Sequence, residues 1–415
     1  MQKTIQTVRG YELLDSRGNP TVGAFVCRSD GAKGFAIAPS GASTGSHEAH
    51  ELRDFDERYF GKGVFKAVEA VNRVLAPAIV QSGTTDQRQI DSLMRELDGT
   101  ENKSALGANA ILAVSLALSK ANANGENLPL YRHIGGLASY RLPVPMMNVL
   151  NGGAHADNNL DIQEFMIVPK KFDRFSERLR AGAEIYHTLK ALLRADHKAT
   201  GVGDEGGFAP DLAGDEEALD YLCRAIREAG YEGKVELALD IASSEWQTPE
   251  GYFLPKRRVS MTASELVRYY ESLCDNYPIC SLEDGCSEDD IAGWQQLTAE
   301  LSRRVMLVGD DLFVTDAKRV ENGAQLKIAN AVLIKPNQIG TLSETMEVLA
   351  MCEKEGYRPV ISHRSGDSED ALIADLAVAV NAPFIKTGAP CRSERTAKYN
   401  RLLIIESEIG ESPVY

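Results

Sequence analysis

Six ionisable side chains each end a short apolar run, at intervals of 23 to 43 residues along the chain. In order they are Asp240, Glu283, Asp310, Lys335, His363 and Lys386. Intervals of this size suit one strand and one crossover helix, so the pattern predicts neighbouring parallel strands. The carboxyl ends of such strands meet at one edge of a sheet, where α/β proteins bind ligands. We therefore expect the six side chains to lie together.

The first three of these residues, Asp240, Glu283 and Asp310, offer only carboxylate oxygens. Buried carboxylates require cations, and an all-oxygen set suits Mg²⁺ better than zinc, which usually recruits His or Cys. For each acid taken alone, a loop cap or a structural ion pair is the alternative interpretation. Their positions on three successive strands favour a metal site.

Lys335 follows the apolar run 331–334 and has no acidic neighbour in the sequence. Desolvation beside bound cations would lower the pKa of such a lysine toward the working pH, so that it could act as a base. A salt-bridged or snorkelling lysine is the alternative. The next strand end carries Arg364 and Ser365, a bidentate donor and a hydroxyl that suit a phosphate.

Three loops carry further polar groups. Residues 201–206 match G-x-G-x-x-G, but a helical stretch precedes them and their two acids would repel a pyrophosphate, so we interpret Glu205 as a positioned general acid. His155 and the pair Gln163-Glu164 flank a second loop. Residues 39–46, rich in glycine and hydroxyls, could close over a charged ligand or form a flexible surface connection.

The surrounding pattern divides the chain in two. Residues 1–135 combine short β-like runs with a helical stretch over 64–122, which predicts an α+β domain. Residues 136–415 repeat strand and helix, and further candidate strands at 144–148 and 165–169 bring the count close to that of an eightfold barrel. An open doubly wound sheet is the alternative.

The composition narrows the class of partners. The chain of 415 residues has 45 basic and 60 acidic side chains, a net charge of -15, which disfavours binding to nucleic acid or anionic membranes. No apolar run reaches the ~18 residues of a membrane span, and the amino terminus lacks an apolar segment. Seven cysteines without a C-x-x-C pair suggest reduced thiols, so we expect a cytoplasmic protein.

Long motifs in one chain order identify a resemblance. The sequence closely resembles the enolase (phosphopyruvate hydratase) family nearly from end to end. The matching stretches are Asp15–Val22, Ser40–Gly45, Leu106–Ile111, Asn151–His155, Gly203–Phe208, Ser281–Asp284, Gly309–Asp311, Lys335–Gly340, Ser362–Gly366, Lys386–Pro390 and Arg392–Arg395.

The resemblance implies an α/β protein with an amino-terminal α+β cap domain and an enolase-type modified (β/α)8 TIM barrel containing one reversed strand and helix. It implies a hydro-lyase of glycolysis and gluconeogenesis that reversibly dehydrates 2-phospho-D-glycerate to phosphoenolpyruvate, with two Mg²⁺ per active site. A homodimer or a larger homo-oligomer is expected.

The resemblance also assigns roles by position. Asp240, Glu283 and Asp310 match ligands of the first Mg²⁺, while Ser43 matches a residue that joins the second Mg²⁺ and substrate. Lys335 matches the base and Glu205 the acid, assisted by Glu164, His155 and His363. The remaining substrate contacts are Gln163, Arg364, Ser365 and Lys386, with Arg364 and Ser365 at the phosphate and Lys386 near the carboxylate.

Two features depart from the family pattern. Residues 246–262 form a shorter stretch than the usual lid, and Ala105 stands where a lysine is expected. The lid leaves open a paralogue that uses the same chemistry on a related phosphonate or phosphorylated acid, as carboxyphosphonoenolpyruvate synthase-like enzymes do. A recruited non-catalytic protein would have lost catalytic residues, whereas this chain retains the set.

Overall fold

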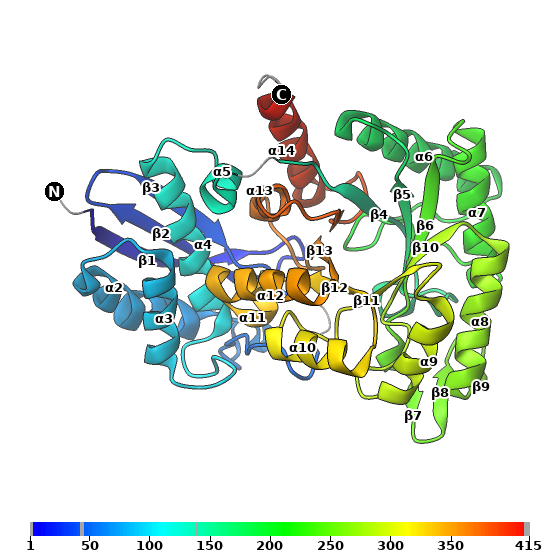
Figure 1. Cartoon of the computed structure of the whole chain (residues 1–415), viewed down its shortest axis with the longest axis horizontal. Coiled ribbons are helices and arrows are strands. Elements are labelled where there is room, and N and C mark those ends of the chain that lie inside the picture. The colour runs from blue at the N-terminus through cyan, green and yellow to red at the C-terminus, as the bar shows by residue number, and fades with distance from the viewer. Residues whose placement is uncertain (1–2, 42–44, 138–139, 411–415) are drawn as a thin grey trace.

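The computed structural model describes residues 3–41, 45–137 and 140–410. The amino-terminal part is an antiparallel sheet in the order β1-β2-β3 with helices packed on one side (Figure 1). The strands are β1 (Ile5–Leu14), β2 (Pro20–Arg28) and β3 (Lys33–Ile37). The helices are η1 (Arg58–Gly61), α1 (Phe65–Glu69), η2 (Ala70–Leu75), α2 (Ala76–Ser82), α3 (Gln87–Asp98), α4 (Ala108–Gly125) and α5 (Leu130–Gly135). The expected α+β unit is confirmed.

Helix α4 is the central element of this cap. Its residues are apolar or small on almost every side, because it packs against β2 and β3 on one side and contacts α11 and α12 of the barrel. Gly34 on β3 permits the close approach, since a Cβ there would lie 2.0 Å from the Ala117 carbonyl oxygen. The cap is therefore fixed to the barrel through α4.

Within the described ranges, eight strands close into a barrel in the order β10-β11-β12-β13-β14-β4-β5-β6. They are β4 (Val144–Asn151), β5 (Glu164–Pro169), β6 (Val235–Asp240), β10 (Ile279–Glu283), β11 (Met306–Gly309), β12 (Ala331–Ile334), β13 (Arg358–Ser362) and β14 (Phe384–Lys386). The expected barrel is confirmed, and the open sheet is excluded. β5 runs antiparallel to both β4 and β6, as the resemblance implied.

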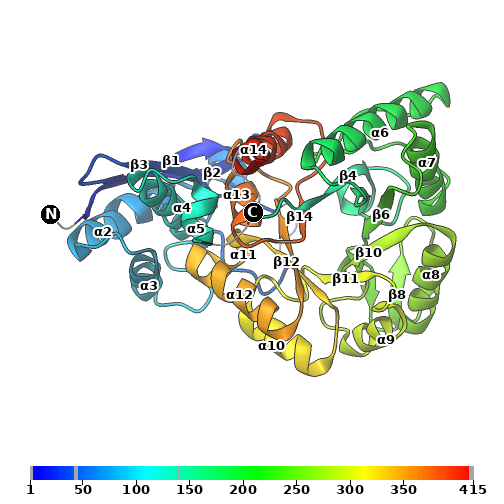
Figure 2. The same cartoon turned by 45° about the horizontal axis from the view of Figure 1, so that its top comes forward.

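Helices surround the barrel, as Figure 2 shows. They are α6 (Phe175–Ala195), α7 (Asp215–Glu228), α8 (Ala263–Asn276), α9 (Ile291–Leu301), α10 (Ala317–Leu326), α11 (Pro336–Ile339), α12 (Leu342–Glu355), α13 (Leu372–Ala379) and α14 (Ser393–Gly410), with short turns η3 (Gly153–His155) and η4 (Ser243–Trp246). The lid stretch forms an antiparallel sheet of β7 (Gln247–Thr248), β8 (Gly251–Leu254) and β9 (Val259–Met261). None of the helices in the described part of the chain has the length and apolarity needed to cross a bilayer.

The alternation of strand side chains aims the polar residues into the barrel. Ala238, Val308 and Leu333 belong to an apolar cluster drawn from alternate strand positions. Each stands two residues before Asp240, Asp310 or Lys335, and side chains two apart on a strand share a face. The same spacing relates Phe384 to Lys386 on β14. The polar groups therefore lie next to this apolar cluster, at the ends of the strands.

Candidate active site

Lys386 gathers acids from three neighbouring strands. Its Nζ lies 2.8 Å from Glu283 Oε1, 3.0 Å from Asp240 Oδ2 and 3.3 Å from Glu164 Oε2. Burial opposes the positive charge, but Asp240 and the other carboxylates outweigh it and raise the pKa of Lys386 well above its ordinary value. Lys386 is therefore a fixed cation in the floor of the site.

The acids fit a divalent cation by their chemistry. Burial and the neighbouring Asp240 raise the pKa of Glu283 well above its usual range, which indicates more negative charge than the lysines balance. Glu283 Oε2 is buried and has no hydrogen-bond partner among the described residues. An orphaned carboxylate oxygen within an all-oxygen set suits Mg²⁺. Asp310 contacts Lys335 directly and accepts a 2.9 Å hydrogen bond from Gln338 Nε2.

The contact with Asp310 changes the expectation for Lys335. The sequence led us to expect a lowered pKa for Lys335 beside bound cations. Burial does act in that direction, but Asp310 at the end of the preceding strand outweighs it and raises the pKa when no cation is present. The lowered pKa stays a prediction for the metal-bound site, where a cation would neutralise Asp310.

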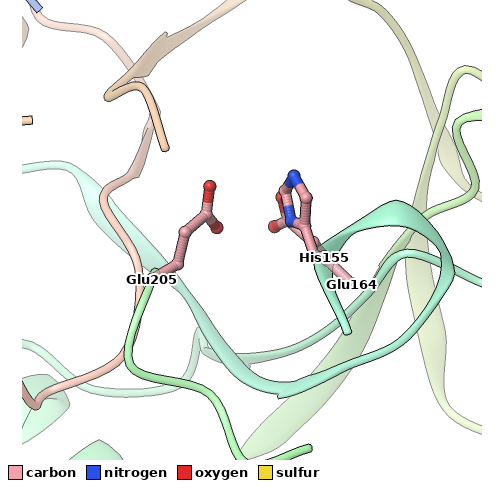
Figure 3. A group of neighbouring side chains, drawn as sticks. All are labelled: His155, Glu164 and Glu205. Atoms are coloured by element: carbon pink, nitrogen blue, oxygen red, sulfur yellow. The ribbon is translucent and has the colours of Figure 1, made fainter. Parts of the chain in front are cut away.

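Glu205 faces His155 and Glu164 across the site (Figure 3). Ligand atoms of these three residues lie within 4.8 Å of one another. Glu205 occupies the tight turn expected at residues 203–206, where Gly206 adopts φ +85° and a Cβ would lie 2.9 Å from the Cys391 carbonyl oxygen. No strand precedes the turn, so its glycines serve to position Glu205.

The carboxyls of Glu164 and Glu205 face one another in different electrostatic surroundings. Burial and the Glu205 carboxylate raise the pKa of Glu164 well above its ordinary value. Burial also opposes ionisation of Glu205, but His363, His155 and Arg395 outweigh it and hold its pKa well below the ordinary value. These surroundings therefore oppose ionisation at Glu164 and favour it at Glu205.

Arg364 is buried at the entrance. Its guanidinium donates to Glu48 at 2.8 and 3.2 Å and to Asn337 Oδ1 at 3.3 Å. Glu48 Oε1 also accepts from the backbone amide of Gly45, within the hydroxyl-rich loop, at 3.1 Å. Glu48 thus ties this loop to Arg364. An anion that binds Arg364 would compete with the Glu48 carboxylate.

A cavity of about 40 Å³ collects the sequence-predicted residues. Its lining includes His155, Gln163, Glu164, Glu205, Asp240, Asp310, Lys335, His363, Arg364, Ser365 and Lys386. Gln163 Nε2 donates to Asp240 Oδ2 at 3.4 Å. Glu283 contacts Lys386 beneath this cavity, and Ser43 lies outside the described residues. A wider cavity of about 410 Å³, lined in part by Gly45, Glu48 and Asn337, shares the lining residue Gly41 with the smaller one.

Sequence reasoning missed Glu48 and Gln338. Glu48 lies in the stretch His47-Glu48-Ala49-His50, which is one residue short of a zinc-protease motif, and in the structure it pairs with Arg364. Gln338 bridges Asp310 and Glu48, at 2.9 and 3.3 Å. It stands three residues after Lys335 in the stretch Lys335–Gly340. Its closeness in sequence to the predicted base could have marked it as a site residue.

Comparisons with known proteins agree with the geometry. The family models "Enolase, N-terminal domain" and "Enolase, C-terminal TIM barrel domain" match residues 5–134 and 139–415. An enolase of Wolinella succinogenes is 54% identical over 411 residues, which cover 98% of this chain and 97% of that protein. An enolase of Sulfurimonas denitrificans is 53% identical over 407 residues, with the same coverage. The barrel, the cavity and these likenesses agree, and the chain belongs to the enolase family.

Proposed function

We propose that this chain is a phosphopyruvate hydratase, which reversibly removes water from 2-phospho-D-glycerate to give phosphoenolpyruvate. The observation that supports this best is a lysine, two facing carboxyls and a buried arginine lining one small cavity. Both similar proteins carry the name enolase, which favours this reaction over a phosphonate-specific paralogue.

Lys335 is the proposed base. Removing the proton from the carbon next to a carboxylate places a second negative charge on that carboxylate's oxygens, so the site must supply positive charge there. Lys386, buried and held cationic by its acids, is placed to contribute. Two Mg²⁺ ions, the first held by Asp240, Glu283 and Asp310 and the second reached by Ser43, would supply further charge stabilisation and neutralise Asp310 beside Lys335.

Glu205 is the proposed acid for the departing hydroxyl. Hydroxide is a poor leaving group, so a proton must reach it as the bond to carbon breaks. The raised pKa of Glu164 favours a proton beside Glu205, and Asn148 Nδ2 orients Glu205 with a 3.0 Å hydrogen bond. His155 lies 3.6 Å from Glu164 and His363 lies 3.5 Å from Glu205, where they assist the transfer.

Arg364 and Ser365 are the proposed phosphate ligands, and Gln163 and Lys386 complete the substrate contacts. Binding would exchange the Glu48 carboxylate on Arg364 for a phosphate oxygen, which releases the loop that Glu48 holds. Phosphate recognition and loop position are coupled through this one ion pair.

The same proposal covers assembly, domains and location. We propose domains at 1–135 and 136–415, and a homodimer or larger homo-oligomer. The face of the β1–β3 sheet opposite α4 carries the rings of Tyr11 and Phe35, 6.2 Å apart, with Phe35 42% exposed, which supports a second copy as its cover.

The unpaired cysteines of the chain support a reducing, cytoplasmic location.

The test is a spectrophotometric assay of purified protein with 2-phosphoglycerate, following the ultraviolet absorbance of the enol product. We expect turnover of ~10 per second or faster, lost with a chelator and restored by Mg²⁺. Absence of turnover in protein that still binds Mg²⁺ and phosphoglycerate would contradict the proposal and favour the phosphonate-specific paralogue.

A further inference from the structure

Arg395 is a fully buried arginine whose guanidinium contacts both the turn that carries Glu205 and the strand end that carries His363. From the first turn of α14, Nη1 donates to His363 Nδ1 and to the Arg364 carbonyl oxygen, both at 2.6 Å. Nη2 donates to the carbonyl oxygens of Ser365 at 2.6 Å and Asp204 at 3.1 Å. One side chain therefore joins the residue before Glu205 to the strand end that carries His363.

The contact with His363 decides where the imidazole proton lies. A guanidinium has only donors and stays protonated in proteins, so its partner nitrogen must act as an acceptor. Nδ1 of His363 therefore bears no hydrogen, and a neutral ring carries its single hydrogen on Nε2. Nε2 lies 3.5 Å from Glu205 Oε2 and has no closer partner among the described residues.

The electrostatics agree with a neutral ring. Burial lowers the pKa of His363 to about 4, with Arg395 adding to this shift and Glu205 opposing it. The Arg395 charge is itself compensated by Glu394 at 3.5 Å and Asp367 at 3.7 Å. The nearby carboxylate Asp367 is held by Lys398 at 2.6 Å.

We propose that Arg395 is a positioning residue, which fixes His363 as the neutral Nε2–H tautomer and directs that N–H at the Glu205 carboxyl. The tautomer follows from the geometry alone, whereas its effect on turnover rests on the proposed function. In that reaction Nε2–H holds the Glu205 carboxyl in position to receive a proton and pass it to the leaving hydroxyl. Arg395 touches no substrate and acts through His363.

The first experiment measures the tautomer in the unaltered protein. Histidine labelled with ¹⁵N is incorporated, and the His363 signals are assigned by their loss in His363→Gln. We expect an unprotonated Nδ1 and a protonated Nε2 at pH 7 without substrate. A protonated Nδ1, in either the other tautomer or an imidazolium, would overturn the proposal whether or not the protein has enolase activity.

The second experiment is a double-mutant cycle on turnover. A misplaced catalytic group can reduce rate by about 100-fold, and we expect a kcat loss of that order for Arg395→Met. In a His363→Gln background the same change should reduce kcat less than about 2-fold further, because residues acting as one unit are not additive. An undiminished loss in that background would assign Arg395 a purely structural role.

Arg392 offers a matched control. It stands just before α14 and donates to the Gly203 carbonyl oxygen at 3.4 Å, the Ser16 carbonyl oxygen at 3.1 Å and Glu394 Oε1 at 2.7 Å. Among the described residues, no hydrogen bond or ion pair joins Arg392 to His363. Arg392→Met should leave the His363 tautomer unchanged, and its kcat effect should be additive with His363→Gln. Should Arg395→Met fail to fold, the tautomer measurement on unaltered protein still decides the proposal.

Discussion

At the scale of single side chains, the proposed base Lys335 and the proposed acid Glu205 should perform separable steps. Lys335→Ala should abolish exchange of the hydrogen on the substrate carbon with solvent, whereas Glu205→Gln should retain this exchange and lose dehydration. Each should lower turnover by at least ~100-fold, the usual contribution of a positioned acid or base. Deuterium incorporation into 2-phosphoglycerate, followed by NMR, measures the first step. Continued exchange without Lys335 would remove it as the base.

His363 should make stability depend on pH. Its pKa falls from 6.5 to about 4 on folding, so between these values the unfolded chain binds a proton that the folded chain does not. The resulting contribution, about 3 kcal/mol, is fully present above pH 6.5 and is lost as the pH falls toward 4. Denaturant unfolding at a series of pH values should show this slope.

The variants separate His363 from other titrating groups. His363→Gln should flatten the slope between pH 4.5 and 6.5 by up to about 1.4 kcal/mol per pH unit, whereas the exposed His47→Gln should leave it as in the unaltered protein. An equal slope in all three proteins would show that other groups carry the dependence.

The sequence revealed the site residues that a local pattern marks, but not those placed by contacts between distant parts of the chain. Asp240, Asp310 and Lys335 each end a short apolar run, and these runs recur at the interval of one strand and one helix, so their common edge could be predicted. Glu48 acquires its place only by pairing with Arg364 across 316 residues, and no local pattern encodes such a contact. Arg395 likewise lies on a helix, and the helical pattern of the sequence does not show that its charge is buried.

At the scale of elements, the cap depends on a close contact between β3 and α4. Gly34→Ala would place a Cβ 2.0 Å from the Ala117 carbonyl oxygen and 2.4 Å from the Ala121 amide nitrogen, both in backbone. We expect a loss of about 1–3 kcal/mol in the free energy of unfolding, because neither backbone can move without disturbing the cap. Urea unfolding measures this loss.

Gly201→Ala is the control, since nothing lies within 4 Å of a Cβ at that position. It should change the free energy of unfolding by less than about 0.5 kcal/mol. An equal loss in both variants would show that the β3–α4 contact is not the cause.

The local sequence pattern could not predict the direction of β5. An apolar run predicts a strand at 165–169, but its orientation depends on the connection from β4, which returns antiparallel. This reversal brings the start of β5 to the active edge, where Glu164 lies opposite Asp240. Only the family resemblance anticipated the reversed strand.

At the scale of the whole molecule, the exposed sheet face should hold two copies together. Phe35→Glu should shift the sedimenting species from a multiple of the 45.2 kDa chain to the single chain, because a buried charge opposes association. Phe253→Glu on β8 is the control, with 40% exposure against 42% for Phe35. Unaltered protein that sediments as one chain would contradict the proposed assembly.

The contacts of Arg364 with Glu48 and of Arg395 with His363 also determine when a chain under synthesis can complete its active site. Synthesis at ~5–20 residues per second separates the emergence of Glu48 and Arg395 by roughly 20 to 70 s. Until β14 leaves the ribosome the barrel cannot close between β13 and β4, and until α14 follows it His363 lacks its orienting donor. We therefore expect activity to begin only after nearly the whole described chain has been made.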